Sequence, residues 1–170
     1  KLNDEMPPGA MISAFGASPD SRWVLYGVMH DDGELVELFS RLTDGSGSPV
    51  RLSGTANAEG DVYDFDFSPD SQRVVYSADE DGTDILKLYT RAIDGSGDAK
   101  MLSKPGDGSI WDFTVFSTNQ VYYIADEDKS GVDELYSRAI DGISPARKWN
   151  GPLIKGGNVD YAEPSPDRRW

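Results

Sequence analysis

The 170-residue chain has 30 acidic and 16 basic side chains, a formal net charge of −14, and no cysteine. This charge argues against nucleic acid or an anionic membrane surface as a partner. The lack of cysteine excludes a disulfide framework, a thiolate metal site and a cysteine nucleophile, and no apolar run reaches the roughly 18 residues that membrane insertion needs.

Two sequence words recur along the chain with one period. Ser-Pro-Asp occurs at 18–20, 68–70 and 165–167, with a degenerate copy, FSTNQVYY, at 116–123. The second word is LFSRLTDG from residue 38, LYTRAIDG from residue 88 and LYSRAIDG from residue 135. A fixed period of roughly 50 residues is typical of a repeated supersecondary unit.

Each unit contains four predicted strands. In the second unit these are VYDFDF at 62–67, RVVYSA at 73–78 and ILKLYTRAI at 85–93, which are rich in β-branched and aromatic residues, and a short segment, KML, at 100–102. The Ser-Pro-Asp corner and the Asp-Gly turns separate them, as expected for tight connections. One unit is therefore predicted to be a four-stranded antiparallel meander.

Apolar residues follow one another in the second strand of each unit, so both faces of the sheet must be covered. Radially stacked four-stranded sheets form a β-propeller. We therefore predict an all-β propeller with an N-terminal extension at 1–9, blades at about 10–60, 61–108 and 109–158, and the start of a fourth at 159–170. Because closed propellers have four to eight blades, we expect a longer polypeptide or a second copy of the chain to complete the ring.

The stretch FSPDSQRVVYSADEDGTDILKLYTRAIDG at 67–95 resembles the repeat of TolB-like β-propellers. The third unit departs from it, because FSTNQ lacks Pro and Asp and predicts a reshaped corner. The resemblance implies a periplasmic or extracellular protein that docks a protein partner. Related propellers are accessory gating domains of prolyl-oligopeptidase-like and tricorn-like peptidases, which is the alternative.

The chain shows little sign of catalytic chemistry. It has no Gly-x-Ser-x-Gly segment, and its one histidine, His30, lies in the acidic turn HDDGE. We therefore predict no catalytic residue within these 170 residues.

Three aspartates recur on the predicted first strands: Asp64, Asp112 and Asp160, spaced by 48 residues. They are candidate ligands for a metal or a basic group of a partner; alternatively, each accepts backbone N–H groups at the inner rim. The aromatic residue after each aspartate is assigned to the core. A second calcium candidate is DEDKSGVDE at 126–134, but its twelfth position is Ser137, which has no carboxylate. No cofactor is expected to be required for folding.

Two basic features complete the prediction. Arg41, Arg91 and Arg138 each precede an aspartate by three residues and are expected to pair with it. The segment Arg147, Lys148 and Trp149 breaks the acidic pattern and is a candidate partner contact, with packing at the blade edge as the alternative. The leading function is a non-enzymatic scaffold that binds a protein or peptide through its rim or channel. The alternatives are an accessory domain of a hydrolase and a metal-binding propeller.

Overall fold

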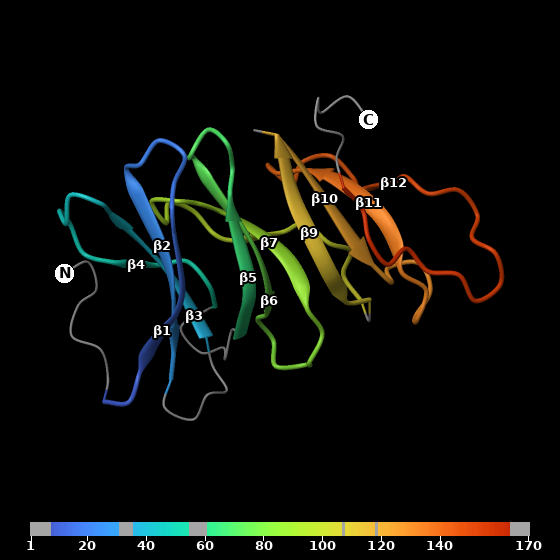
Figure 1. Cartoon of the computed structure of the whole chain (residues 1–170), viewed down its shortest axis with the longest axis horizontal. Helices are drawn as coiled ribbons and strands as arrows, with labels where there is room; N and C mark the ends of the chain where they lie inside the picture. Colours follow the sequence, from blue (N-terminus) through green and yellow to red (C-terminus); the bar gives the residue numbers. More distant parts are fainter. Residues whose placement is uncertain (1–7, 31–35, 55–60, 107, 118, 164–170) are drawn as a thin grey trace.

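Strands are the only regular elements that the computed structural model shows in the residues it describes, namely 8–30, 36–54, 61–106, 108–117 and 119–163. They form three four-stranded antiparallel sheets, each in chain order, and the sheets lie side by side from β1 to β12 (Figure 1). Sheet 1 contains β1 (Met11–Ala17), β2 (Trp23–Met29), β3 (Val36–Leu42) and β4 (Val50–Arg51). Sheet 2 contains β5 (Asp61–Phe67), β6 (Arg73–Asp79), β7 (Lys87–Ala92) and β8 (Lys100–Met101). Sheet 3 contains β9 (Ile110–Ser117), β10 (Gln120–Ala125), β11 (Glu134–Ala139) and β12 (Arg147–Lys148).

This architecture confirms the predicted all-β class and the four-stranded antiparallel units. Nothing in the described part of the chain is a helix long and apolar enough to cross a lipid bilayer. The predicted extension at 1–9 and the end of the predicted fourth unit lie largely outside the described residues.

The Ser-Pro-Asp corner is a closed hydrogen-bonded turn. In sheet 2 the Ser68 hydroxyl donates to Asp70 (2.6 Å) and accepts from the Arg73 N–H (2.9 Å), while Asp70 also accepts from the Gln72 N–H (3.1 Å). Ser71 has a φ of 59°, the left-handed conformation that such a tight turn requires. The corner at Ser18 repeats these contacts.

The third corner is shorter, as the loss of Pro and Asp predicts. Ser117, at the end of β9, pairs directly with Gln120, at the start of β10. The hairpin therefore closes within two intervening residues, whereas Ser68 and Arg73 bracket four.

Apolar packing between consecutive sheets forms the core. On β6, Val74, Val75 and Tyr76 are all fully buried. Val75 belongs to the cluster shared with sheet 3, whereas Val74 and Tyr76 belong to the cluster shared with sheet 1. Sheet 2 is thus covered on both faces, as the continuous apolar run predicts.

A half-buried glutamate links sheets 2 and 3 each to the sheet before it. Glu80 accepts the Tyr76 hydroxyl (2.7 Å) and the Gly54 N–H of sheet 1's last loop (3.0 Å). The contact is repeated one sheet later by Glu127, which accepts the Tyr123 hydroxyl (3.2 Å) and the Lys104 N–H (2.5 Å). Because both junctions use the same residue types, we call this contact the glutamate latch.

The recurrent arginines do not form the predicted pairs with the aspartates that follow them. Arg91 donates to Gly95 and Gly97 in its own turn and to Leu52 of sheet 1 (3.0 Å). Arg138 likewise donates to its own turn and to Leu102 of sheet 2. The aspartates instead accept backbone N–H groups two residues ahead of them, as Asp94 does from Ser96 (2.9 Å).

The segment after sheet 3 repeats two contacts made by the segment after sheet 2. The Asp133 N–H donates to Asn158 (3.2 Å) and the Val159 N–H to the Asp133 carbonyl (2.9 Å). The same two bonds join Leu86 to the beginning of β9, through Ser109 and Ile110. Asn158 and Val159 therefore hold the positions beside sheet 3 that Ser109 and Ile110 hold beside sheet 2, and no strand is assigned to 158–163.

The glutamate latch predicts a pH effect on stability. Burial raises the pKa of Glu127, partly offset by the Lys104 N–H. The folded chain therefore binds the proton of the Glu127 carboxyl group more tightly than the unfolded chain does. As pH rises above 4.5, the ordinary pKa of a glutamate, Glu127 lowers the free energy of unfolding. Urea unfolding at several pH values from about 4 to 7 should show a shallower decline for Glu127→Gln than for the original chain. Parallel pH profiles for the two proteins would contradict this assignment.

Candidate functional site

The inner edges of the sheets carry a row of aromatic and acidic side chains. β5 has a bulge between Val62 and Asp64, and β9 has one between Ile110 and Asp112, and each of these two bulges leaves one residue without a partner in the register. At each of these bulges the unpaired residue is aromatic and the next residue is an aspartate. The segment 158–163 carries an aspartate followed by an aromatic residue, which is the reverse order. We call these six exposed residues the inner row: Tyr63, Asp64, Trp111, Asp112, Asp160 and Tyr161.

The aspartates of β5 and β9 lie close enough to repel each other. Burial raises the pKa of Asp64; its acceptance of the Phe65 N–H (2.8 Å) opposes this, and the charge of Asp112 adds to the increase. The backbone contact confirms, for Asp64, the predicted alternative of N–H acceptance at the inner rim. Neighbouring inner strands thus bring two of the three predicted aspartates together.

Asp160 does not occupy the same place as Asp64 and Asp112, which corrects the alignment based on 48-residue spacing. The hydrogen bonds at Asn158 and Val159 align Asp160 with Trp111, and Tyr161 with Asp112. The spacing misled because the connection after sheet 3 is longer: Trp149 and Asn158 are nine positions apart, whereas the equivalent Leu102 and Ser109 are seven apart. Together with the longer β9 and the shorter third corner, this makes the equivalent spacing 49. Asp160 instead lies near Asp133, whose pKa is raised by burial and further by the charges of Asp126 and Asp160.

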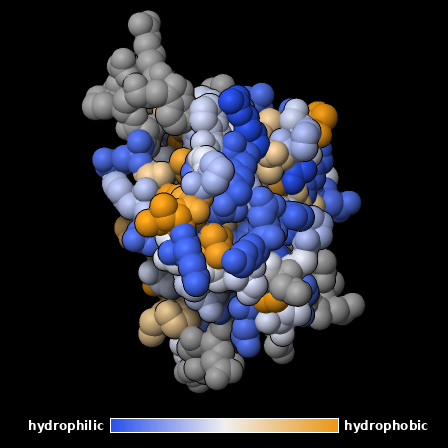
Figure 2. Space-filling model, turned by 90° about the vertical axis from the view of Figure 1, so that its right-hand side faces the viewer, coloured by the Kyte–Doolittle hydropathy of each residue, from blue (hydrophilic) through white to orange (hydrophobic). Residues whose placement is uncertain are grey.

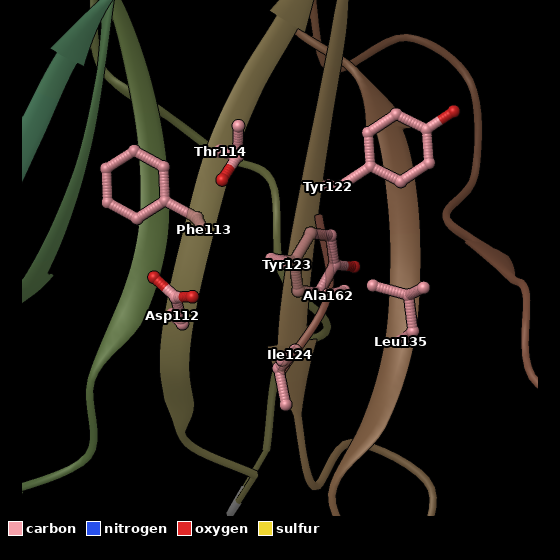
Figure 3. Close-up of a pocket in the computed structure, with 8 residues that line it drawn as sticks. All are labelled: Asp112, Phe113, Thr114, Tyr122, Tyr123, Ile124, Leu135 and Ala162. Atoms are coloured by element: carbon pink, nitrogen blue, oxygen red, sulfur yellow. The ribbon is translucent and has the colours of Figure 1, made fainter. Parts of the chain in front are cut away.

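The predicted core position of the aromatic after each aspartate is only partly right. Phe113 is 8% exposed and packs toward sheet 2 (Figure 3), whereas Tyr161 is 66% exposed. The aromatics before the aspartates, Tyr63 and Trp111, were missed by sequence reasoning and are 66% and 69% exposed. Their position at a bulge, which changes the side a residue faces, is not visible in a simple two-residue alternation.

Acidic side chains are not grouped as a metal site. Among the described residues, no three or more His, Asp or Glu side chains are placed to hold an ion. In the second calcium candidate, Asp126 accepts the N–H groups of Ser109 (2.6 Å) and Gly131 (2.8 Å), and Ser137 accepts the Trp149 indole N–H (2.7 Å). Calcium binding stays a prediction that these contacts do not test.

The single histidine contacts the carboxylate of Glu37. His30 Nε2 is 2.8 Å from Glu37 Oε2, and Arg51 contacts the other oxygen of Glu37 (2.9 Å). These contacts place His30 next to the paired strands β3 and β4.

The basic segment 147–149 makes its contacts within sheet 3. The Arg147 guanidinium stacks on the Trp149 ring, 4.3 Å from its centroid. Lys148 forms ion pairs with the buried Glu134 and with Asp128 (3.4 Å). Trp149 also packs beside Tyr122, with ring centroids 5.8 Å apart. The structure thus shows the alternative of packing at the sheet edge, and the partner contact stays a prediction.

One face of sheet 3 is only partly covered. Its residues Tyr122, Leu135 and Trp149 hold the places of Val75, Leu88 and Leu102, which are fully buried in sheet 2, but they are only half-buried. Figure 3 shows Tyr122 and Leu135 on the side away from sheet 2, with Ala162 over a shallow hollow that they line. The surface seen from the sheet 3 side is otherwise largely hydrophilic, with a compact hydrophobic patch (Figure 2).

Comparison with known proteins gives a likeness of fold. No protein-family model and no curated protein matches the chain. Among solved structures, it is similar to a puromycin-hydrolyzing peptidase from Mycobacterium tuberculosis, with 15% identity and a TM-score of 0.63 over 89% of this chain. It is also similar to oligopeptidase B from Trypanosoma brucei, with 13% identity and a TM-score of 0.58 over 89% of this chain. The match spans 25% and 22% of those two chains, so this chain corresponds to about a quarter of each.

The Lys148–Glu134 pair predicts a measurable loss of stability. Replacing Lys148 with Met, the residue at the equivalent Met101 of sheet 2, leaves the Glu134 carboxylate, only 8% exposed, without its cation. We expect Lys148→Met to lower the free energy of unfolding, because the carboxylate loses the positive charge that offsets its removal from water. Denaturant unfolding would measure it.

The double variant Glu134→Gln with Lys148→Met is the matched control, because it removes the buried charge together with its partner. It should regain most of the lost stability. An equal loss in the single and double variants would show that Lys148 stabilises sheet 3 through packing and not through its charge.

Proposed function

We propose that this chain is a section of a β-propeller that acts as a non-catalytic accessory domain of a peptidase-type hydrolase. The observation that carries the proposal is the likeness of fold, over 89% of this chain, to about a quarter of each of two peptidases. The absence of a Gly-x-Ser-x-Gly segment from the sequence supports an accessory role. The TolB-like repeat words are compatible with this assignment, because related propellers accompany peptidase domains.

The packing of the sheets supports the propeller. Phe15, Phe65 and Phe113 hold one place on the inner strands, yet Phe15 is 80% exposed and Phe113 only 8%. The difference arises because Phe113 packs on the preceding sheet, whereas no described sheet precedes β1. Exposed faces at both ends of the array favour additional sheets on each side, as in a ring.

A scaffold that binds a protein or peptide is the second candidate. The observation that favours it is the inner row, whose exposed aromatics have no part in the apolar clusters between sheets. The two candidates are compatible, since an accessory domain can also bind a peptide.

A serine-directed fluorophosphonate probe tests the peptidase assignment on the complete product of the gene that encodes this chain. We expect covalent labelling, and we expect the labelled serine, located by mass spectrometry, to lie outside these 170 residues. The isolated 170-residue chain is the control and should stay unlabelled. A complete gene product that does not react, or a labelled serine within the 170 residues, would contradict the proposal.

A further inference from the structure

We propose that the inner row binds a basic peptide, with Lys or Arg side chains placed between its aromatic rings and its carboxylates. The proposal concerns residues within this chain and does not depend on an attached hydrolase.

The inner row is continuous from sheet 2 to the segment after sheet 3. Asp112 lies at its centre: its charge contributes to the raised pKa of Asp64 on one side and of Tyr161 on the other. Trp111 and Asp160 have a common neighbour, Asp133. Burial raises the pKa of Asp133, a hydrogen bond from Trp111 lowers it, and the charge of Asp160 raises it further. Three successive inner segments thus present one surface.

The aromatic members are exposed without a structural role in the core. Tyr63, Trp111 and Tyr161 are each about two thirds exposed, and none belongs to the two apolar clusters. An aromatic face attracts a Lys or Arg head group within about 6 Å, and this attraction strengthens when the pair is removed from water. Exposed rings beside carboxylates therefore select a cation that also has an apolar stem, which describes both basic side chains.

The acidic members define the sign of the partner. Asp64, Asp112 and Asp160 are all exposed, and the chain's charge of −14 adds a long-range field that attracts cations and repels anions. Asp133 supplies one more carboxylate beside Trp111.

The arrangement fits an extended partner better than a metal ion. The carboxylates are distributed over successive inner segments, and within the described residues they form no three-member cluster for an ion. A peptide with several basic side chains can contact them one after another. The inner strands are also the edge strands of their sheets, so their aromatic and acidic residues are reached without opening a sheet.

Fluorescence anisotropy of a labelled peptide of alternating arginine and glycine, added to the full 170-residue chain, tests the proposal. We expect saturable binding that weakens several-fold when NaCl is raised from about 50 to 300 mM, because exposed charge pairs are screened. The same peptide with citrulline in place of arginine keeps the shape and loses the charge, and it should not bind. Equal binding of the two peptides would overturn the proposal.

Variants of the inner row locate the site. Asp64→Asn with Asp112→Asn should weaken binding of the arginine peptide about tenfold, and Trp111→Leu about threefold. The matched control, Asp84→Asn with Asp98→Asn, removes the same charge from the turns on either side of β7 and should change binding less than twofold. Near-ultraviolet circular dichroism checks folding; if the aspartate variant does not fold, Trp111→Leu and the citrulline peptide decide the matter.

Three results would overturn the assignment. These are unchanged binding in the inner-row variants, an equal loss in the control, and calcium binding that depends on Asp64 and Asp112 while the arginine peptide does not bind.

Discussion

The second strand of each sheet is apolar on both faces, and this constraint determines how the sheets are arranged. A strand such as β6, with Val74, Val75 and Tyr76 all fully buried, is stable only between two other sheets. Burial of an aromatic or aliphatic side chain stabilises by about 1.5–3 kcal/mol. A separated sheet would lose that contribution from both faces, so the sheets must stack.

Stacking alone would allow the sheets to slide, and the buried polar contacts oppose this. The glutamate latch joins a tyrosine of one sheet to the last loop of the sheet before it, and the arginine of the third strand reaches a carbonyl of the same loop. Because a buried donor or acceptor without a partner is costly, a shift of one sheet would disrupt several bonds at once. The latches therefore define the relative position that apolar packing leaves open.

The repeat words predicted the strands and the corners because each encodes a local turn with its own hydrogen bonds. The Ser68 and Asp70 contacts follow from residue type and spacing alone. Bonds that cross between sheets were not predicted: Arg91 was expected to pair with Asp94, yet it reaches a carbonyl about 40 residues earlier in the chain. Sequence spacing gives no information on which backbone groups a neighbouring sheet presents.

The inner row was only half predicted, for a related reason. Asp64 and Asp112 were found by their spacing, but the longer connection between Trp149 and Asn158 shifts the equivalence, so Asp160 takes the place of an aromatic. Tyr63 and Trp111 were overlooked because a bulge exposes residues that regular alternation would not. Features that depend on register are therefore the least accessible to sequence reasoning.

Residue-resolved hydrogen exchange in the native state tests the central claim, that burial between two neighbours stabilises each sheet. The account predicts that the amides of β6, in the sheet covered on both faces, exchange more slowly than those of β2 and β10 and only through global unfolding. Exchange of β6 amides at the same rate as those of β2 and β10, or faster, would contradict it.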